Sequence, residues 1–314
     1  MLRFFVKRIF SMALVLLVVA VTIFVIMHLL PGNPAAIMLG PEATNEEVAA
    51  LAAQMGLDQP IWVQFTEWIG KLLRGDLGSS LFFQGKSVPQ VISSHLEATI
   101  LLTLFSLSLS AVIGIVSGVL AAATHESIFD RGFMLLTSLA VAVPNFWFGL
   151  MLVLGFAIML PILPPAGYRP LSSGIWSCFS YLILPSITLA AGGVALIARM
   201  TRACMLDVLR NEYIRTAKAK GVGQIMVIFK HSLRNAIIPV VTVIGMSFAN
   251  LMGGAVVTES IFNIPGVGRL LIKSVFTRDY PVIEGVVLYI AIAWTLVNLI
   301  VDVIYTVIDP RLEY

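Results

Sequence analysis

Six long runs of the chain contain no Asp, Glu, Lys or Arg. They are Ile9–Leu30, Ala98–Ala123, Gly132–Tyr168, Pro170–Ala198, Asn235–Thr258 and Gly285–Val301. A helix needs roughly 20 mostly apolar residues to cross the ~30 Å hydrocarbon core of a bilayer, and each run is near or above that length. The pattern therefore predicts an all-α integral membrane protein with six transmembrane helices.

Prolines mark where these apolar runs bend or end. Only Arg169 separates the third run from the fourth, but a cluster of turn-forming residues surrounds it: Pro161, Pro164, Pro165, Gly167 and Pro170. Such a cluster breaks a helix and forms a turn, which predicts two helices joined by a short loop. Pro144 lies inside the third run, and we expect it to bend that helix because proline lacks a backbone N–H.

The polar stretches between the runs divide the chain into four parts. We expect an N-terminal end with the first helix at 1–30, an extracytoplasmic segment at 31–97, a membrane core at 98–308 and a cytoplasmic tail at 309–314. Within 31–97, Asn45–Met55 and Trp62–Leu73 have helical patterns. The aromatic residues of the second stretch fit either a small folded cap or a belt at the membrane surface.

A basic segment, residues 199–234, separates the fourth run from the fifth. It holds eight Lys or Arg residues against two acids, Asp207 and Glu212. Apolar or small residues recur at helical spacing between the charges: Ile214, Ala217, Gly221, Ile225, Ile228 and Phe229. This pattern predicts a surface helix that docks on another protein. The alternative is a basic loop that only sets topology and contacts anionic lipid.

Composition and charge agree with a membrane protein and fix its orientation. Of 314 residues, 59% are hydrophobic and only 12% are charged, about half the charge of an ordinary soluble domain. The loops on the side of the basic segment hold thirteen Lys and Arg, and those on the other side hold seven. Because basic loops stay in the cytoplasm, we expect both termini to be cytoplasmic and residues 31–97 to lie outside.

The N-terminus also resembles a secretory signal peptide, because Arg3, Lys7 and Arg8 precede an apolar run. That run is longer than a signal peptide needs, and residues 31–34 offer no small-residue cleavage site. A retained first helix is therefore favoured.

Small residues form two rows at four-residue spacing, Ser106–Ser110–Gly114–Gly118 in the second run and Gly245–Ala249–Gly253 in the fifth. Such rows let membrane helices approach closely. We expect ordinary packing within the bundle, with a tightly packed conduit as the sharper alternative.

The chain carries no pattern typical of an enzyme. Its four histidines are scattered, without the helical pairing that holds a metal ion, and we expect no catalytic site, metal site or bound cofactor, and no nucleic-acid partner. The apolar runs also lack the intramembrane acids that ion-coupled carriers use. Energy for transport is therefore expected to come from a partner that acts on the basic segment.

The basic segment resembles a known motif. Arg215–Gly221, reading RTAKAKG, is followed by KHSLRNAIIP at Lys230–Pro239, and together they are similar to the cytoplasmic coupling motif of ABC-transporter permeases, in the variant used by peptide importers. That family motif begins with Glu, whereas Arg215 stands in this place here. Seven further short matches occur in order along the chain: PGNP (31–34), GLDQP (56–60), GDLGSS (75–80), PNFW (144–147), ESIFNIPGVG (259–268), RDYP (278–281) and DPRL (309–312).

The resemblance implies an inner-membrane permease of the dipeptide, oligopeptide, glutathione and nickel-chelate importers. It implies four kinds of partner: a second homologous permease, two cytoplasmic ATPases that bind ATP and Mg²⁺, an extracytoplasmic binding protein, and membrane lipid. The substrate would be a peptide-like small molecule, or a nickel chelate as the alternative. A channel or ion-coupled carrier is the competing hypothesis from a different class.

Two groups of residues are the predicted sites. Contact with the ATPase is expected at Arg215, Thr216, Ala217, Lys218, Ala219, Lys220 and Gly221, where Gly221 ends the helix. In the family, the ESIFNIPGVG stretch lies near the outer mouth of the pathway, which implies a role for Glu259, Phe262, Pro265, Gly266 and Gly268. The alternative for the second group is that its Pro and Gly residues only shape a turn.

Overall fold

The computed structural model describes residues 2–29, 34–40, 42–54, 56–83 and 85–308. Throughout these residues the regular structure is helical, apart from an isolated β-bridge between Ser79 and Ser87. The expected all-α fold is confirmed. The C-terminal tail with its DPRL motif, residues 31–33 of the PGNP motif and Met55 lie outside the described residues.

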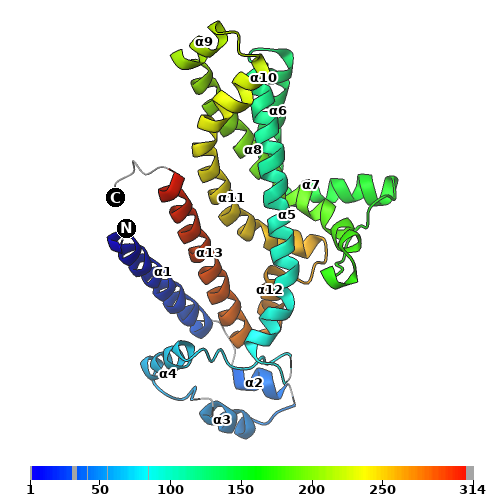
Figure 1. Cartoon of the computed structure of the whole chain (residues 1–314). Helices are drawn as coiled ribbons and strands as arrows, with labels where there is room; N and C mark the ends of the chain where they lie inside the picture. The colour runs from blue at the N-terminus through cyan, green and yellow to red at the C-terminus, as the bar shows by residue number, and fades with distance from the viewer. Residues whose placement is uncertain (1, 30–33, 41, 55, 84, 309–314) are drawn as a thin grey trace. The chain divides into compact units, whose positions relative to one another are not determined.

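Five helices are long and apolar enough to cross a membrane, and a bent pair makes a sixth if it counts as one span. The five are α1 (Leu2–Leu29), α5 (Val88–Ala123), α8 (Ile175–Leu209), the continuous run of α10, η3 and α11 (Gln224–Ile261), and α13 (Tyr280–Ile308). Figure 1 shows them as the longest rods of the chain. Each helix is longer than its predicted apolar run, because it continues into the polar residues at one or both ends of that run.

The third span differs from the expected single crossing helix. It consists of α6 (Ile128–Ala142) and α7 (Asn145–Val153), which meet at 104°, with the π-helix η1 (Leu154–Met159) continuing α7. The break lies at Pro144, as the sequence predicted. Val143 before it is extended, with φ −81° and ψ 126°, because a proline ring excludes the helical conformation of the preceding residue.

The chain forms two compact units. The first comprises residues 1–97 and 267–295, and the second comprises 98–266 and 296–314. Helices α5 and α13 each contribute one part to each unit.

The first unit holds the short helices of the polar segment, α2 (Pro34–Leu39), α3 (Asn45–Gln54) and α4 (Ile61–Leu73), together with α12 (Val267–Thr277). The two predicted helices correspond to α3 and α4. Helix α3 begins with a capping box, because the backbone N–H and hydroxyl of Thr44 both donate to Glu47 Oε2 at 2.9 Å. These bonds hold the pKa of the Glu47 carboxyl below its ordinary value.

Aromatic residues attach α4 to the end of α1. The ring of Phe24 lies 5.1 Å from that of Phe65 and 5.6 Å from that of Trp68, between centroids. Trp62 lies on the exposed face of α4. Phe65 and Trp68 therefore pack within the unit, as the alternative of a small folded cap predicts, whereas Trp62 faces outward.

The second unit is built around α8, whose contact with α5 uses the small-residue row. A Cβ atom added to Gly114 would lie 2.8 Å from the Ile197 side chain, and one added to Gly118 would lie 2.6 Å from the Ala198 carbonyl oxygen. The Ser110 hydroxyl donates to the Ala190 carbonyl at 3.1 Å. The packing role expected for this row is confirmed.

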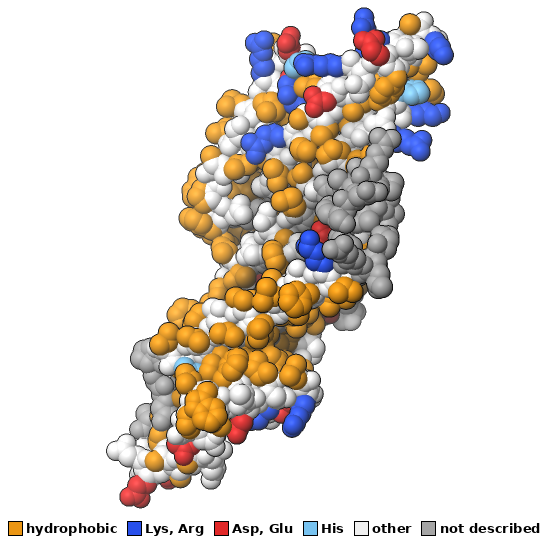
Figure 2. Space-filling view, turned by 90° about the vertical axis from the view of Figure 1, so that its left-hand side faces the viewer, with side chains coloured by type: hydrophobic (Ala, Val, Ile, Leu, Met, Phe, Trp, Pro, Cys, Tyr) orange, Lys and Arg blue, Asp and Glu red, His pale blue; other side chains and the backbone are white. Residues whose placement is uncertain are grey.

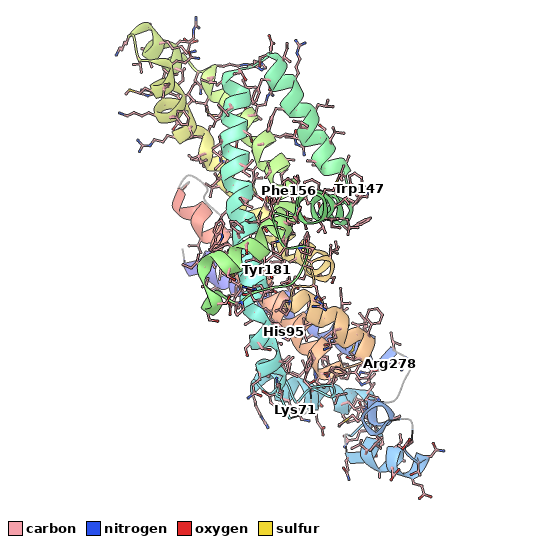
Figure 3. All side chains as sticks on the ribbon, turned by 90° about the vertical axis from the view of Figure 1, so that its right-hand side faces the viewer. Lys71, His95, Trp147, Phe156, Tyr181 and Arg278 are labelled. Carbon is pink, nitrogen blue, oxygen red and sulfur yellow. The ribbon has the colours of Figure 1, made fainter. Side chains whose placement is uncertain are left out.

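The predicted proline-rich turn joins η1 to α8. It contains a short 3-10 helix, η2 (Leu171–Ser173), and Gly167 at φ +105° donates its N–H to the Phe262 carbonyl at 2.7 Å. The Arg169 guanidinium lies over the ring of Tyr181, 5.4 Å from its centroid. Figure 3 labels Tyr181 on α8. The turn is therefore attached to α8 and to the end of α11.

Candidate functional site

The basic segment folds into a short surface helix, α9 (Glu212–Ala219). Its end is a Schellman motif: Gly221 N–H donates to the Lys218 carbonyl at 3.0 Å, and Val222 N–H donates to the Ala217 carbonyl at 3.2 Å. Gly221 has φ +79°, a conformation that glycine adopts without strain. The helix stop predicted from RTAKAKG is therefore present at this glycine.

Two neighbouring residues hold α9 in place. Ile214 is completely buried, and the Tyr213 hydroxyl accepts a hydrogen bond from Asn235 Nδ2 at 2.9 Å and donates to the His231 carbonyl at 3.4 Å. Asn235 lies on α11 (Arg234–Ile261), and His231 lies on the π-helix η3 (Val227–Leu233) that precedes it. These contacts attach α9 to the start of a helix that is long and apolar enough to cross a membrane.

The rest of α9 faces solvent. Arg215, Thr216, Lys218 and Ala219 are exposed, as are Lys220 and Gly221 after the helix, while Ala217 is half-buried. Figure 2 shows Lys and Arg side chains gathered at this end of the second unit, with hydrophobic side chains and a few Asp and Glu side chains among them. The predicted contact residues thus form one accessible, cationic surface.

Helix α9 does contain an acidic residue, Glu212, although the family motif has its Glu at the position of Arg215. Arg215 Nη1 lies 2.8 Å from Glu212 Oε1, one turn earlier, and the two side chains are 72% and 82% exposed. An ion pair this exposed contributes little to stability. Both groups therefore remain available to a partner.

The predicted outer-mouth residues occupy different environments. Glu259 and Phe262 are buried at the end of α11, Gly266 is buried, and Pro265 is exposed. Gly268 is buried in α12, which belongs to the other unit.

A buried carboxylate shapes this turn. Glu259 is completely buried and accepts a hydrogen bond from the Thr99 hydroxyl at 2.6 Å. A Cβ atom on Gly266 would collide with the carboxylate of Glu259, so this position has no space for a side chain. Glu259 and Gly266 therefore determine how the backbone turns here. Of the predicted outer-mouth residues, Pro265 is the one that is exposed to solvent.

Sequence reasoning missed an ion pair between α6 and α8 in the second unit. Arg202 on α8 donates to both oxygens of Asp130 on α6, at 2.6 and 2.7 Å. Asp130 also accepts the Glu126 backbone N–H at 3.1 Å and lies 3.3 Å from His125 Nδ1. The partners are 72 positions apart, and no local pattern signals such a pair.

Two of the recognised motifs meet in the first unit. Asp279 of RDYP accepts hydrogen bonds from the Ser80 hydroxyl at the end of GDLGSS and from the backbone N–H groups of Leu81 and Phe82, both at 3.1 Å. Glu284, which lies just before the last predicted apolar run, accepts the Trp68 indole N–H at 2.8 Å. Each acid joins the polar segment to α13 or to the turn before it.

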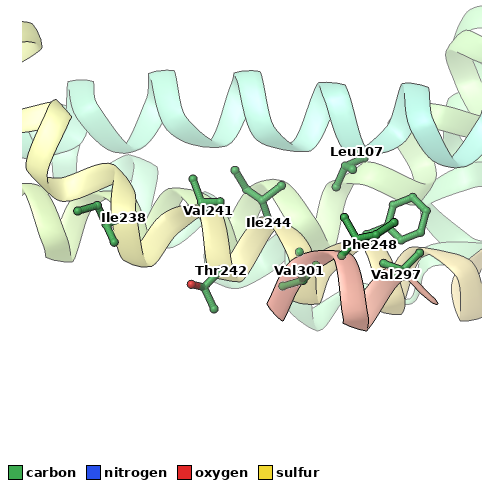
Figure 4. A pocket seen from close by; sticks show the side chains of 10 residues that line it. Leu107, Ile238, Val241, Thr242, Ile244, Phe248, Val297 and Val301 are labelled. Carbon is green, nitrogen blue, oxygen red and sulfur yellow. The ribbon is translucent and has the colours of Figure 1, made fainter. Parts of the chain in front are cut away.

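One apolar cavity of about 290 Å³ lies in the second unit between α5, α11 and α13 (Figure 4). Its walls include Leu107, Phe248 and Val297, and Thr242 provides a hydroxyl. None of the predicted site residues lines it.

Comparison with known proteins decides the family. Residues 114–314 match the family described as the binding-protein-dependent transport system inner membrane component, and residues 1–103 match the N-terminal part of that membrane component. The chain belongs to this family of transport permeases. It is a multi-pass membrane protein of the ABC importer class, and its recognition from the coupling motif is confirmed.

Full-length relatives carry peptide or glutathione names. The chain is 42% identical over 308 residues to a probable peptide ABC transporter permease of Sinorhizobium fredii, covering 98% of both proteins. It is 42% identical over 314 residues to the glutathione transport permease GsiC of Salmonella choleraesuis. It is 41% identical over 334 residues to the dipeptide permease DppB of Alkalihalophilus pseudofirmus. Each comparison covers 100% of both proteins.

Solved structures agree on the fold. An inward-facing form of the methionine ABC transporter MetNI has a TM-score of 0.58 at 16% identity, over 70% of this chain and 97% of that one. An amino acid ABC transporter has a TM-score of 0.50 at 15% identity, over 69% and 94%. At this identity the likeness concerns the fold of the permease.

Proposed function

We propose that this chain is one of two non-identical permease subunits of an ATP-driven importer for dipeptides, oligopeptides or glutathione. The full-length relatives named for these substrates support the cargo class, and none of those cited is named for nickel. Both termini lie in the cytoplasm, as the distribution of basic residues predicts.

The partners follow from the same proposal. A second homologous permease completes the pathway, two ATPases bind ATP and Mg²⁺ and hydrolyse the ATP, and an extracytoplasmic binding protein delivers the substrate. The permease itself binds no cofactor. Pro265, exposed at the turn before α12, is the residue of the outer-mouth group that is accessible to the binding protein.

Helix α9 receives the motion of the ATPases. ATP binding draws the ATPases together and moves α9, whose attachment through Ile214 and Tyr213 passes the movement to η3 and α11. The pathway then opens outward, and hydrolysis resets it. The observation that carries this proposal is a cationic helix that is exposed to solvent, ended by a Schellman glycine and attached to a membrane span.

Substitutions at Gly221 test the coupling role. A Cβ there meets nothing within 4 Å, so Gly221→Val acts only through the positive φ, which a β-branched residue tolerates badly. We expect Gly221→Val to reduce ATP-dependent uptake at least tenfold, and Gly221→Asn to retain most of it because Asn tolerates this conformation.

Gly223 provides the matched control. It lies two residues later, also with open space around it, at φ −59°, so Gly223→Val is unstrained. Uptake should be normal in Gly223→Val, and all three variants should insert into the membrane equally. Normal uptake by Gly221→Val would exclude the coupling role, and uptake by the chain alone without ATP would favour a channel or carrier.

A further inference from the structure

The apolar cavity of the second unit is elongated along one membrane-spanning helix. Its α11 wall runs from Ile238 to Phe248, which is about 15 Å along the helix at 1.5 Å per residue. Figure 4 shows the labelled side chains of α11 in order along this wall, with Leu107 of α5 and Val297 of α13 toward the Phe248 end. The long axis of the cavity therefore follows the span.

The depth of the cavity in the membrane follows from the charges of α11. Arg234 is the last charged residue before an uncharged run that ends at Thr258. Ile238 lies about 6 Å beyond Arg234 and Phe248 about 21 Å beyond it, and half of the hydrocarbon core is about 15 Å thick. The cavity thus spans most of the leaflet on the side of the basic segment, which the proposed orientation places next to the cytoplasm.

The cavity is accessible from the surroundings of the chain. None of its ten lining residues is buried, and Ile300 on α13 is 57% exposed. At this depth a membrane provides hydrocarbon rather than water. The walls of an apolar cavity that stays empty forfeit dispersion contacts, so an apolar occupant stabilises the arrangement of the three helices.

Polarity and width select the occupant. The walls provide a single side-chain hydroxyl, that of Thr242, so a peptide would leave its charged ends unpaired there at high cost. A volume of about 290 Å³ spread over about 15 Å of helix has a mean width of about 5 Å, which suits one hydrocarbon chain, because carbons in contact lie about 4 Å apart. A helix with its side chains is about 10 Å wide and does not enter such a space.

We propose that this cavity binds one acyl chain of a phospholipid from the leaflet on the side of the basic segment. The chain lies along α11 and contacts α5 and α13. It supplies close apolar packing between these helices, which membrane helices otherwise obtain from one another. This inference depends on the membrane spans and not on the cargo or the ATPase, so its failure would leave the proposed function untouched.

The test uses the assembled transport complex in nanodiscs that contain a phospholipid with a photo-reactive diazirine in the middle of one acyl chain. After illumination, mass spectrometry of the digested permease locates the label. In the wild type we expect label on two walls, at residues 238–248 of α11 and 297–301 of α13. Val241→Phe/Val297→Phe fills the cavity with two rings and should reduce this labelling by about tenfold or more, because the chain must displace them.

Val257→Phe is the matched control. Val257 lies on the same helix, is 49% exposed and is not among the residues that line the cavity. The same substitution there should leave the labelling of the cavity walls unchanged. Because Val257 is exposed to the bilayer without a cavity, label in its stretch of α11 also measures casual contact with lipid, and the cavity walls should exceed it.

Three results would overturn the inference. One is a wild-type complex whose cavity walls carry no more label than the stretch around Val257, and this comparison needs no variant to fold. Another is equal labelling of the walls in the wild type and in an assembled Val241→Phe/Val297→Phe complex. The third is a photo-reactive residue at Ile244 that cross-links to the second permease instead of lipid, which would assign the cavity to a partner subunit.

Discussion

Two ion pairs of the second unit differ in how exposed they are to solvent. Their contributions to the free energy of unfolding should differ accordingly. The side chains of Asp130 and Arg202 are 3% and 20% exposed, whereas Glu212 and Arg215 are almost wholly in solvent. A buried charge that loses its partner remains desolvated. An exposed charge returns to water at little cost.

We therefore predict that Arg202→Met lowers the free energy of unfolding in detergent by about 3 to 5 kcal/mol. Its counterpart Arg215→Met should lower it by less than about 1 kcal/mol. The double variant Asp130→Asn/Arg202→Met should recover part of the loss, because no charge then remains buried without a partner. Equal small effects of the two single variants would show that the Asp130 pair does not hold α6 to α8.

At the residue scale, sequence reasoning succeeded where the cause is local. The stop of α9 at Gly221 follows from a glycine after a helical pattern, and its hydrogen bonds span only a few residues. The partners of Glu259 and Asp279 lie 160 and 199 positions away. Such contacts depend on how the helices pack, and a single sequence carries no local signal of that.

The contact between α5 and α8 is the clearest case at the scale of elements. Gly118 faces the Ala198 carbonyl oxygen and the Thr201 side chain, so the two helices touch through backbone as well as side chains. Backbone cannot move aside as the end of a flexible side chain can. Close approach of this kind supplies the packing energy that lipid does not.

Gly118→Ala should therefore destabilise the folded protein by about 3 kcal/mol, as overpacking does in a close-packed core. Gly192→Ala is the control, because a Cβ at Gly192 on α8 meets nothing within 4 Å. It should leave stability unchanged or raise it by up to about 1 kcal/mol, the helix-propensity gain of Ala over Gly. Thermal unfolding of both variants in one detergent tests this, and a neutral Gly118→Ala would mean that α5 and α8 are not in close contact.

The positions of the elements were largely predictable from apolar length. The apolar runs identify the membrane helices because hydrocarbon imposes a minimum length, and Pro144 identifies the bend. The 104° angle at that bend was not predictable, because proline removes a hydrogen bond without fixing the direction of the next helix. The split of the basic segment into buried Ile214 and exposed Ile225 also required the structure, since one helical pattern fits both.

At the scale of the whole molecule, the family was recognised from motifs spread over most of the chain, and full-length relatives confirm it. The transported molecule, in contrast, could not be predicted from these motifs. The apolar cavity beside α11 presents a single hydroxyl, that of Thr242. In the proposed importer, recognition of the cargo is expected to reside mainly in the separate binding protein.

The central claim is that an ATPase acts on this permease through α9, and a cross-link from one exposed position tests it most directly. Ala219 is exposed at the end of α9, so a photo-reactive residue placed there is not expected to disturb the fold. In the assembled complex the account predicts a cross-link to the ATPase, with a yield that changes when ATP is added, and none from the same residue at Ile175. An intact, transport-competent complex that gives no cross-link from Ala219 to the ATPase would contradict the account.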